Sequence, residues 1–334
     1  MFLTPLRLLL KSETCPELLQ LDGKTEDRAD TLIYFLTMSH VIKPIHKILG
    51  LADRFSAEQI QMACGILDTN CYEIKWDRGI ARGLFSHVAL INHDCAPNCR
   101  KFFDAHRNMH VMTCSEVENQ DELSLSYTNP LYSTPMRQAI LHQTKHFQCI
   151  CQRCQDPQEL GSGLSLLKCK NKADQCTGLA ALVDPLSTES DWTCLIESCQ
   201  FTISSDMAKM MLETSMNSIS GENTGDAQDT LDTLTNLGRF LPESNHVMVD
   251  LKLKLIDQVI ENDSLRDQFE DKAIEFCFQL LQTARVIAPG KSKLRGILSM
   301  KYHQLTEKGP NPLVLPKDYI DNMFAEDQSV LLLD

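Results

Sequence analysis

Long apolar runs are missing from this sequence. No stretch of the 334 residues approaches the roughly 20 consecutive apolar residues that cross a bilayer. The first residues, from Met1 to Leu10, are too short and too interrupted for the apolar part of a secretory signal, and no small-residue cleavage site follows them. We therefore expect neither membrane insertion nor export, and we place the protein in the nucleus, the cytoplasm or both.

Positive charge and nucleotide-binding motifs are also scarce. Lys and Arg total 32 against 45 Asp and Glu, a formal net charge of −13. An acidic surface repels phosphate backbones and anionic lipids, so we expect no direct binding to nucleic acid or membranes, whereas a basic peptide would suit it. The chain has no G-x-x-x-x-G-K-[ST], G-x-S-x-G or G-x-G-x-x-G motif. Nucleotide hydrolysis, serine-esterase and Rossmann functions therefore lack support.

Cysteine, by contrast, is abundant and unevenly distributed. The chain has 14 cysteines, and eight of them fall in two groups between Cys95 and Cys199. Disulfide frameworks belong to small secreted domains, and this chain is large and shows no export signal. The grouping therefore indicates metal binding rather than oxidation.

The first group is a C-x-C-x-x-C segment formed by Cys149, Cys151 and Cys154. Three thiolates can converge on one ion from so tight a loop, but a structural zinc site takes four ligands. The fourth ligand must come from elsewhere in the chain. Cys95 is the leading candidate, and Cys99 is the alternative.

The second group consists of two cysteine pairs, Cys169 with Cys176 and Cys194 with Cys199. Two pairs about twenty residues apart resemble a small zinc ribbon, in which each pair supplies one knuckle. The segment is rich in Lys, Asp, Thr and Gly, so it would have little core without a metal. The alternative is two buried cysteine pairs under a loop.

Hydrophobic periodicity divides the chain into four segments. Residues 1–75 are predicted to be helical, 76–155 to contain short strands and the first cysteine group, 156–204 to hold the second group, and 205–334 to be helical again. One predicted helical face contains Ala29, Leu32, Ile33, Leu36 and His40, and a capping motif begins at Ser56. Four methionines after residue 205 are expected to fill gaps in the core. They are Met207, Met210, Met211 and Met216.

Two motifs and the cysteine triad together carry a resemblance to a known family. Asn92-His93-x-Cys95-x-Pro97-Asn98 and Glu122-Leu123-Ser124-Leu125-Ser126-Tyr127 are about thirty residues apart, and the C-x-C-x-x-C segment follows them. In this order and spacing they resemble the SET domain with its post-SET zinc loop. With the helical C-terminal region, the chain resembles the SET-and-MYND-finger (SMYD-like) lysine methyltransferases over roughly residues 70–310, most closely their arthropod-type branch.

The resemblance implies an α+β fold: a helical insertion before the SET core, a SET β-fold with a post-SET zinc loop, a zinc-ribbon-like segment and an α-helical, TPR-like C-terminal domain. It implies methyl transfer from S-adenosylmethionine to a lysine of a protein, histone or not, and protein partners for the helical domain. Tyr127 would be catalytic and would also contact the cofactor. Asn70, Asn92, His93 and Phe147 would bind the cofactor, with Phe147 stacked on the adenine.

The chain also departs from the family pattern. No Gly-rich N-terminal SET strands and no MYND cysteine-histidine array precede residue 60. Lys145 stands where active relatives commonly carry an aromatic wall of the lysine channel, and Asp94 replaces a common serine. We therefore expect a truncated or weakly active methyltransferase. The alternative is a catalytically inactive, zinc-binding SET-family protein that acts as a protein-interaction or transcriptional-regulatory module.

Overall fold

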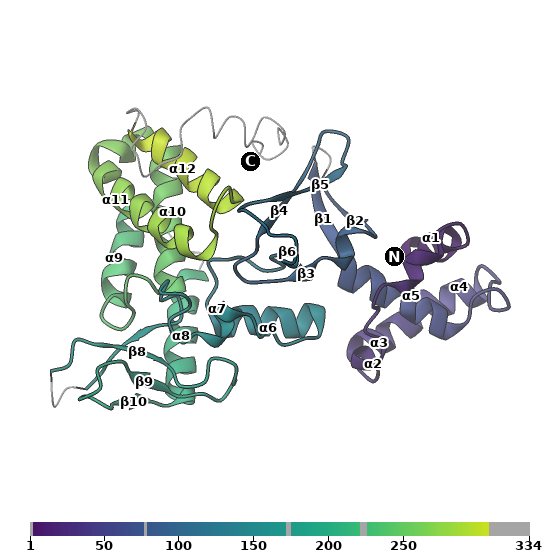
Figure 1. The fold of residues 1–334 in the computed structure, drawn as a ribbon, viewed down its shortest axis with the longest axis horizontal. Helices are drawn as coiled ribbons and strands as arrows, with labels where there is room; N and C mark the ends of the chain where they lie inside the picture. The colour runs from purple at the N-terminus through teal and green to yellow at the C-terminus, as the bar shows by residue number, and fades with distance from the viewer. Residues whose placement is uncertain (1–2, 77–78, 172–174, 221–225, 307–334) are drawn as a thin grey trace.

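The computed structural model of the chain has an α+β architecture, as the sequence predicts. It describes residues 3–76, 79–171, 175–220 and 226–306. Figure 1 shows the N-terminal helices at one end, the helices of the C-terminal half at the other, and short strands between them. Within the described ranges, no helix combines the length and the apolar character needed to cross a membrane.

The N-terminal region is a cluster of short helices around its own apolar core. The elements are α1 (Leu3–Ser12), η1 (Pro16–Gln20), α2 (Thr25–Arg28), α3 (Leu32–Thr37), η2 (Met38–Ile42), α4 (Lys43–Lys47) and α5 (Ala57–Asn70). The predicted capping motif is confirmed, because the Ser56 hydroxyl accepts from the Gln59 amide at 3.2 Å and the Gln59 side chain accepts from the Ser56 amide at 2.9 Å. This cap fixes where α5 begins.

The residues predicted to lie on one helical face between Ala29 and His40 do not all belong to one α-helix, and the apolar ones do not face the core. Leu32 is 73% exposed and Ile33 50%, while Ala29 lies outside the helix, which begins after the Thr31 cap. From Met38 the chain adopts a π-helical turn. The π-helical turn changes the angular position of His40 alone among these residues. Leu32, Ile33 and Leu36 precede it and are exposed because their side of α3 is turned away from the core.

Short strands form the central region. They are β1 (Cys71–Trp76), β2 (Gly79–Leu84), β3 (Asn92–His93), β4 (Cys99–Phe103), β5 (Met109–Thr113) and β6 (Ser124–Leu125), with a 3₁₀ turn η3 (Val88–Leu90). They pair as three two-stranded sheets: β1 with β2 and β4 with β5 are antiparallel, and β3 with β6 is parallel. The short strands predicted within residues 76–155 are present, and β1 already begins at Cys71, before the predicted boundary at 75.

The second cysteine-rich segment folds as a small antiparallel sheet. After α6 (Thr134–Lys145) and α7 (Gln152–Gln155) come β7 (Leu167–Lys168), β8 (Leu179–Leu182), β9 (Trp192–Cys194) and β10 (Thr202–Ile203). Their order in the sheet is β10-β9-β8-β7. Buried Leu167 and Trp192 belong to the same apolar core as the C-terminal helices, so this sheet packs on them rather than standing alone.

The C-terminal region is helical, as predicted, up to the end of the described residues. Its helices are α8 (Ser205–Ser220), α9 (Ala227–Leu237), α10 (His246–Glu261), α11 (Asp263–Ile287) and α12 (Lys293–Thr306). The predicted methionine core is only partly correct. Met216 packs against the core, but Met207 is 52% and Met210 61% exposed, because Ala208 is the buried residue in this turn of α8.

Two lysines link the β7 end of the small sheet to the C-terminal end of α9. Lys168 donates to the Gly238 carbonyl, and Lys170 donates to the Arg239 carbonyl at 2.5 Å. The last carbonyls of a helix have no partner within it and carry partial negative charge, so ammonium groups stabilise them. The sheet and the helical region therefore share polar contacts as well as a core.

A tight turn between α11 and α12 docks the helical region onto the central strands. Gly290 has φ +65°, and a Cβ built there would lie 1.8 Å from the Cys114 carbonyl oxygen, just after β5. The next residue, Lys291, donates its amide to the same carbonyl at 2.8 Å. Both the left-handed backbone and the close approach require glycine at this position.

We expect Gly290→Ala to lower the free energy of unfolding by about 3 kcal/mol, because it adds backbone strain and a clash with Cys114. Urea unfolding measures this. Gly50→Ala is the matched control: Gly50 also has φ +65° but has nothing within 4 Å of the added Cβ, so it should lose only about 1 kcal/mol. Equal losses in the two variants would show that the contact with Cys114 contributes nothing.

Candidate functional site

The parallel pairing of β3 with β6 brings the two sequence motifs together. Asn92 pairs with Ser124, and His93 with Leu125. Asn98 locks this crossing, because its side chain accepts from the Ser124 amide at 2.8 Å and donates to the Glu122 carbonyl at 2.8 Å. Both polar ends of one amide are thus used to hold the second motif against the first.

Tyr127 lies directly beside His93. The Tyr127 amide donates to His93 Nδ1 at 3.0 Å, and the ring centroids are 5.1 Å apart. Nδ1 is therefore an acceptor, which is the arrangement of a neutral imidazole. Burial agrees with this, because it lowers the pKa of His93 to about 4. The Tyr127 hydroxyl donates to the Ile91 carbonyl at 2.5 Å, and burial raises the pKa of this phenol.

Phe147 completes an aromatic group with these two residues. Its ring meets that of His93 edge-on, with centroids 6.0 Å apart, and it packs with Tyr127 around the buried Leu141 and cysteines of the first group. Three of the five residues predicted to bind a cofactor are thus brought together.

The other two predicted cofactor residues lie at the margin. Asn92 is exposed and donates its side-chain amide to Glu122 at 2.5 Å. Asn70 ends α5 and donates to the carbonyls of Asp22 at 2.9 Å and Ile66 at 3.0 Å. The structure does not turn the Asn70 side chain toward Tyr127, although the carbonyl of the preceding residue takes part in the site.

Two half-buried lysines and a tyrosine also surround Tyr127. Lys145 donates to the Thr69 carbonyl, and its ammonium lies 5.2 Å from the Tyr127 ring centroid. Lys101, in β4, donates to the Ser126 carbonyl at 3.2 Å and lies 5.3 Å from the Tyr72 ring centroid. Burial, assisted by the charge of Lys145, lowers the pKa of Lys101 to about 8. Of these residues, the sequence motifs indicate only Lys145. Tyr72 lies in β1 and Lys101 in β4, and no local sequence pattern shows that these two strands meet beside Tyr127.

The first cysteine group converges on one point. The ligand sulfurs of Cys95, Cys149, Cys151 and Cys154 all lie within 4.8 Å of one another, with 3.4 Å between those of Cys95 and Cys154. Cys99, the alternative fourth ligand, is buried in β4 and is not one of the four. Four sulfurs at this spacing match the donor set of a structural zinc site.

The charges around this cluster also suit a bound cation. Hydrogen bonds from Cys149, Cys154 and Cys95 lower the pKa of Cys151, while hydrogen bonding to Cys149 and its other neighbours raises the pKa of Cys95. Hydrogen bonding with Cys149 also lowers the pKa of Cys154, so two of the four sulfurs ionise more readily than an ordinary thiol. A divalent metal would balance the charge of several thiolates at once.

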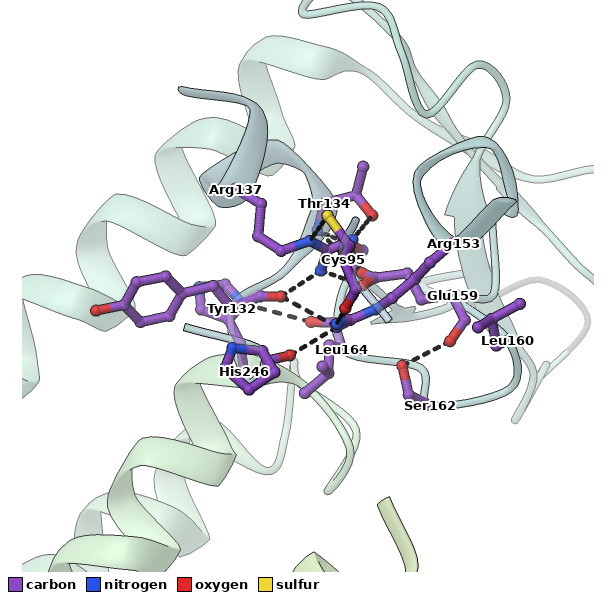
Figure 2. A network of polar contacts seen from close by, with 12 residues as sticks. Cys95, Tyr132, Thr134, Arg137, Arg153, Glu159, Leu160, Ser162, Leu164 and His246 are labelled. Atoms are coloured by element: carbon purple, nitrogen blue, oxygen red, sulfur yellow. Dashed lines mark hydrogen bonds and ion pairs between the residues drawn. The ribbon is translucent and has the colours of Figure 1, made fainter. Parts of the chain in front are cut away.

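A fully buried ionic network supports the cluster from one side (Figure 2). Arg137 donates to the Cys95 sulfur at 3.2 Å and to Glu159 at 2.6 Å, and Arg153 donates to Glu159 at 3.1 Å. Burial raises the pKa of Glu159, but the two guanidinium groups outweigh it and leave the pKa below the ordinary value. One carboxylate between two guanidinium groups leaves a net positive charge facing the thiolates.

The second cysteine group also converges. The sulfurs of Cys169, Cys176, Cys194 and Cys199 lie within 4.8 Å of one another, at the end of the β7–β10 sheet. The Asn171 side chain donates to the Cys199 sulfur at 3.4 Å, which lowers the pKa of Cys199 to about 7. Amide donors to sulfur are typical of thiolates that bind a metal, because the metal-bound sulfur keeps partial negative charge.

Comparison with known proteins agrees with this geometry. The SET domain family model matches residues 10–128. The chain is 31% identical over 210 residues to SET domain-containing protein SmydA-8, isoform A, of Drosophila melanogaster, which covers 61% of this chain and 45% of that protein. Residues 10–128 of this chain thus match the SET domain family, and the chain is similar to SMYD-like SET proteins over more than half of its length.

Other relatives are more distant. Histone-lysine N-methyltransferase Smyd1 of Mus musculus is 25% identical over 119 residues, 31% of this chain and 24% of that protein. Histone-lysine N-methyltransferase ASHR1 of Arabidopsis thaliana is 32% identical over 108 residues, 31% of this chain and 22% of that protein. The chain thus spans less than half the length of these curated relatives.

We expect the purified protein to contain about two zinc ions per chain, and Cys151→Ser to reduce this to about one and to destabilise the strands around Tyr127. Metal analysis by mass spectrometry measures the content. Cys99→Ser, at a buried cysteine outside both clusters, is the control and should leave the content unchanged. Equal metal loss in both variants would contradict the assignment of Cys151.

We expect Arg137→Gln to lower the free energy of unfolding by about 3 kcal/mol, because it leaves the buried Glu159 with one guanidinium partner. The matched control is Arg54→Gln, whose ion pair with Glu13 is about half exposed (51% for both side chains) and should contribute less than about 1 kcal/mol. Since the pKa of Glu159 is lowered by folding, its stabilisation is present above pH 4.5 and is lost as the pH falls below that value. A pH-independent difference between wild type and Arg137→Gln would contradict this account.

Proposed function

We propose that the protein is a SET-type protein-lysine methyltransferase that uses S-adenosylmethionine, with weak turnover. The observation that carries the proposal is the β3–β6 pairing, which sets His93 beside Tyr127, with the Phe147 ring against His93. These are three residues to which the family resemblance gives cofactor or catalytic roles. The cofactor supplies an electrophilic methyl group.

In this proposal Phe147 and His93 form the aromatic surface for the cofactor, and the exposed Asn92 provides polar contacts at its edge. The Tyr127 hydroxyl donates a hydrogen bond to the Ile91 carbonyl, so the lone pairs of the phenol oxygen can accept a hydrogen bond from a lysine amine. That contact would orient the amine for in-line attack. Most of the rate acceleration then comes from positioning the amine against the methyl group, and the protein forms no covalent bond with the substrate.

We further propose that both cysteine clusters hold zinc as structural ions. Each offers four sulfurs and a nearby hydrogen-bond donor to sulfur, Arg137 in the first and Asn171 in the second. The first ion would hold the loop after Phe147 against the residues that follow β3. The substrate would be a lysine in a protein, histone or not; the helical region would bind protein partners, and the protein would act in the nucleus, the cytoplasm or both.

One observation favours the second candidate function, a catalytically inactive interaction or transcriptional-regulatory module. Helix α3 exposes large apolar side chains to solvent: Leu32 is 73% exposed, Phe35 56% and Leu36 46%. Scattered exposed leucines are common, but neighbouring ones on a short helix are typical of interaction surfaces. Binding without turnover would fit this candidate.

Isothermal titration calorimetry with S-adenosylmethionine tests the proposed function directly. We expect binding by the wild-type chain and slow methyl transfer to a basic peptide, with Tyr127→Phe reducing transfer at least about tenfold because the amine loses its orienting contact. Tyr34→Phe, at a tyrosine of α3 in the N-terminal helices, is the control and should leave transfer unchanged. No cofactor binding at millimolar concentration would favour the interaction module instead.

A further inference from the structure

Lys145 has an unusual place at the candidate site. It is the last residue of α6, its ammonium donates to the Thr69 carbonyl, and it lies over the face of Tyr127, 5.2 Å from the ring centroid. Thr69 belongs to the last turn of α5, where the free carbonyls carry partial negative charge. One carbonyl and one aromatic face thus hold the ammonium from two sides.

These two partners are what an incoming lysine side chain would need in the same place. An ammonium or amine in a half-buried site is stabilised by a carbonyl acceptor and by the electron-rich face of an aromatic ring. Tyr127 is also the residue that would orient the amine in the proposed reaction. The ammonium of Lys145 therefore lies against the face of the same tyrosine whose hydroxyl would receive the substrate amine.

The charge at the site adds to this steric effect. The ammonium of Lys101 approaches from β4 and donates to the Ser126 carbonyl at 3.2 Å, one residue from Tyr127. Among the described residues, no carboxylate is within ion-pair distance of either ammonium. A substrate ammonium, and likewise a sulfonium cofactor, would enter a region that holds two uncompensated positive charges, and like charges at this range repel.

We propose that Lys145 is a built-in occupant of the amine-accepting position beside Tyr127, and that it holds the site closed to the lysine of a protein substrate. This inference rests on the proposed function, since it takes Tyr127 as the residue that receives the amine. The site opens when Lys145 leaves the Tyr127 ring or loses its charge. Lys145 acts here by exclusion and is not a catalytic residue.

Three variants test this proposal in the full chain. Lys145→Gln removes the charge, Lys145→Arg keeps it, and Lys252→Gln is the matched control. Lys252 is also a buried lysine over an aromatic ring, 5.1 Å from the Phe276 centroid, and donates to the Glu243 carbonyl at 3.1 Å, but it lies in α10. Two readouts are taken: binding of S-adenosylmethionine by calorimetry, and methyl transfer to a synthetic histone-tail peptide by mass spectrometry.

We expect Lys145→Gln to raise methyl transfer by about tenfold, with Lys145→Arg and Lys252→Gln at the wild-type level. If Lys145→Gln fails to fold, as judged by circular dichroism, Lys145→Met keeps the apolar stem and carries the same expectation. Cofactor binding without a rise in transfer for the uncharged variants would overturn the inference and leave the proposed function standing. An equal rise in Lys252→Gln would also overturn it. Absence of cofactor binding in every variant would instead overturn the proposed function, and the inference with it.

Discussion

The convergence of four sulfurs at Cys95, Cys149, Cys151 and Cys154 is the constraint on which the candidate site depends. Cys95 directly follows β3, whereas the other three follow α6, more than fifty residues later in the chain. When the four cysteines lie together, the Phe147 ring packs against His93, and Phe147 and Tyr127 cover the small core around the cluster. Without this link the pairing of β3 and β6, only two residues long on each strand, would have little to hold it.

The first cysteine cluster is also linked to the Tyr127 and Phe147 rings through polar contacts of His93. His93 contacts the Cys95 sulfur with one ring nitrogen at 3.2 Å and accepts from the Tyr127 amide with the other. Arg137, which also pairs with Glu159, donates a hydrogen bond to the same Cys95 sulfur. A change in the charge on the sulfurs therefore reaches Tyr127 through a single imidazole, so the structural cluster and the proposed reaction site are not independent parts of the molecule.

The sequence was a good guide wherever the signal was local or carried by a motif. The cysteine spacing, the two motifs and the Ser56 cap lead directly to features of the structure. It failed where packing against other segments decides the outcome. The apolar residues of α3 keep a helical period but face away from the core, and Met207 faces outward because Ala208 takes the buried position. The arrangement of Lys101 and Lys145 around Tyr127, and the contact of Gly290 with Cys114, depend on segments far apart in the chain, and no local pattern records which segments will meet.

The lysines that join β7 to the end of α9 have a consequence for how the molecule opens. Lys168 and Lys170 donate to the Gly238 and Arg239 carbonyls just after α9, and Leu167 and Trp192 are buried in the core of the helical region. If the small sheet separated from these helices, the core would be exposed to solvent and the two carbonyls would lose their lysine donors. Amide hydrogens of β8 and α10 should thus exchange with solvent in the same unfolding event, because the β7–β10 sheet and the C-terminal helices form a single cooperative unit.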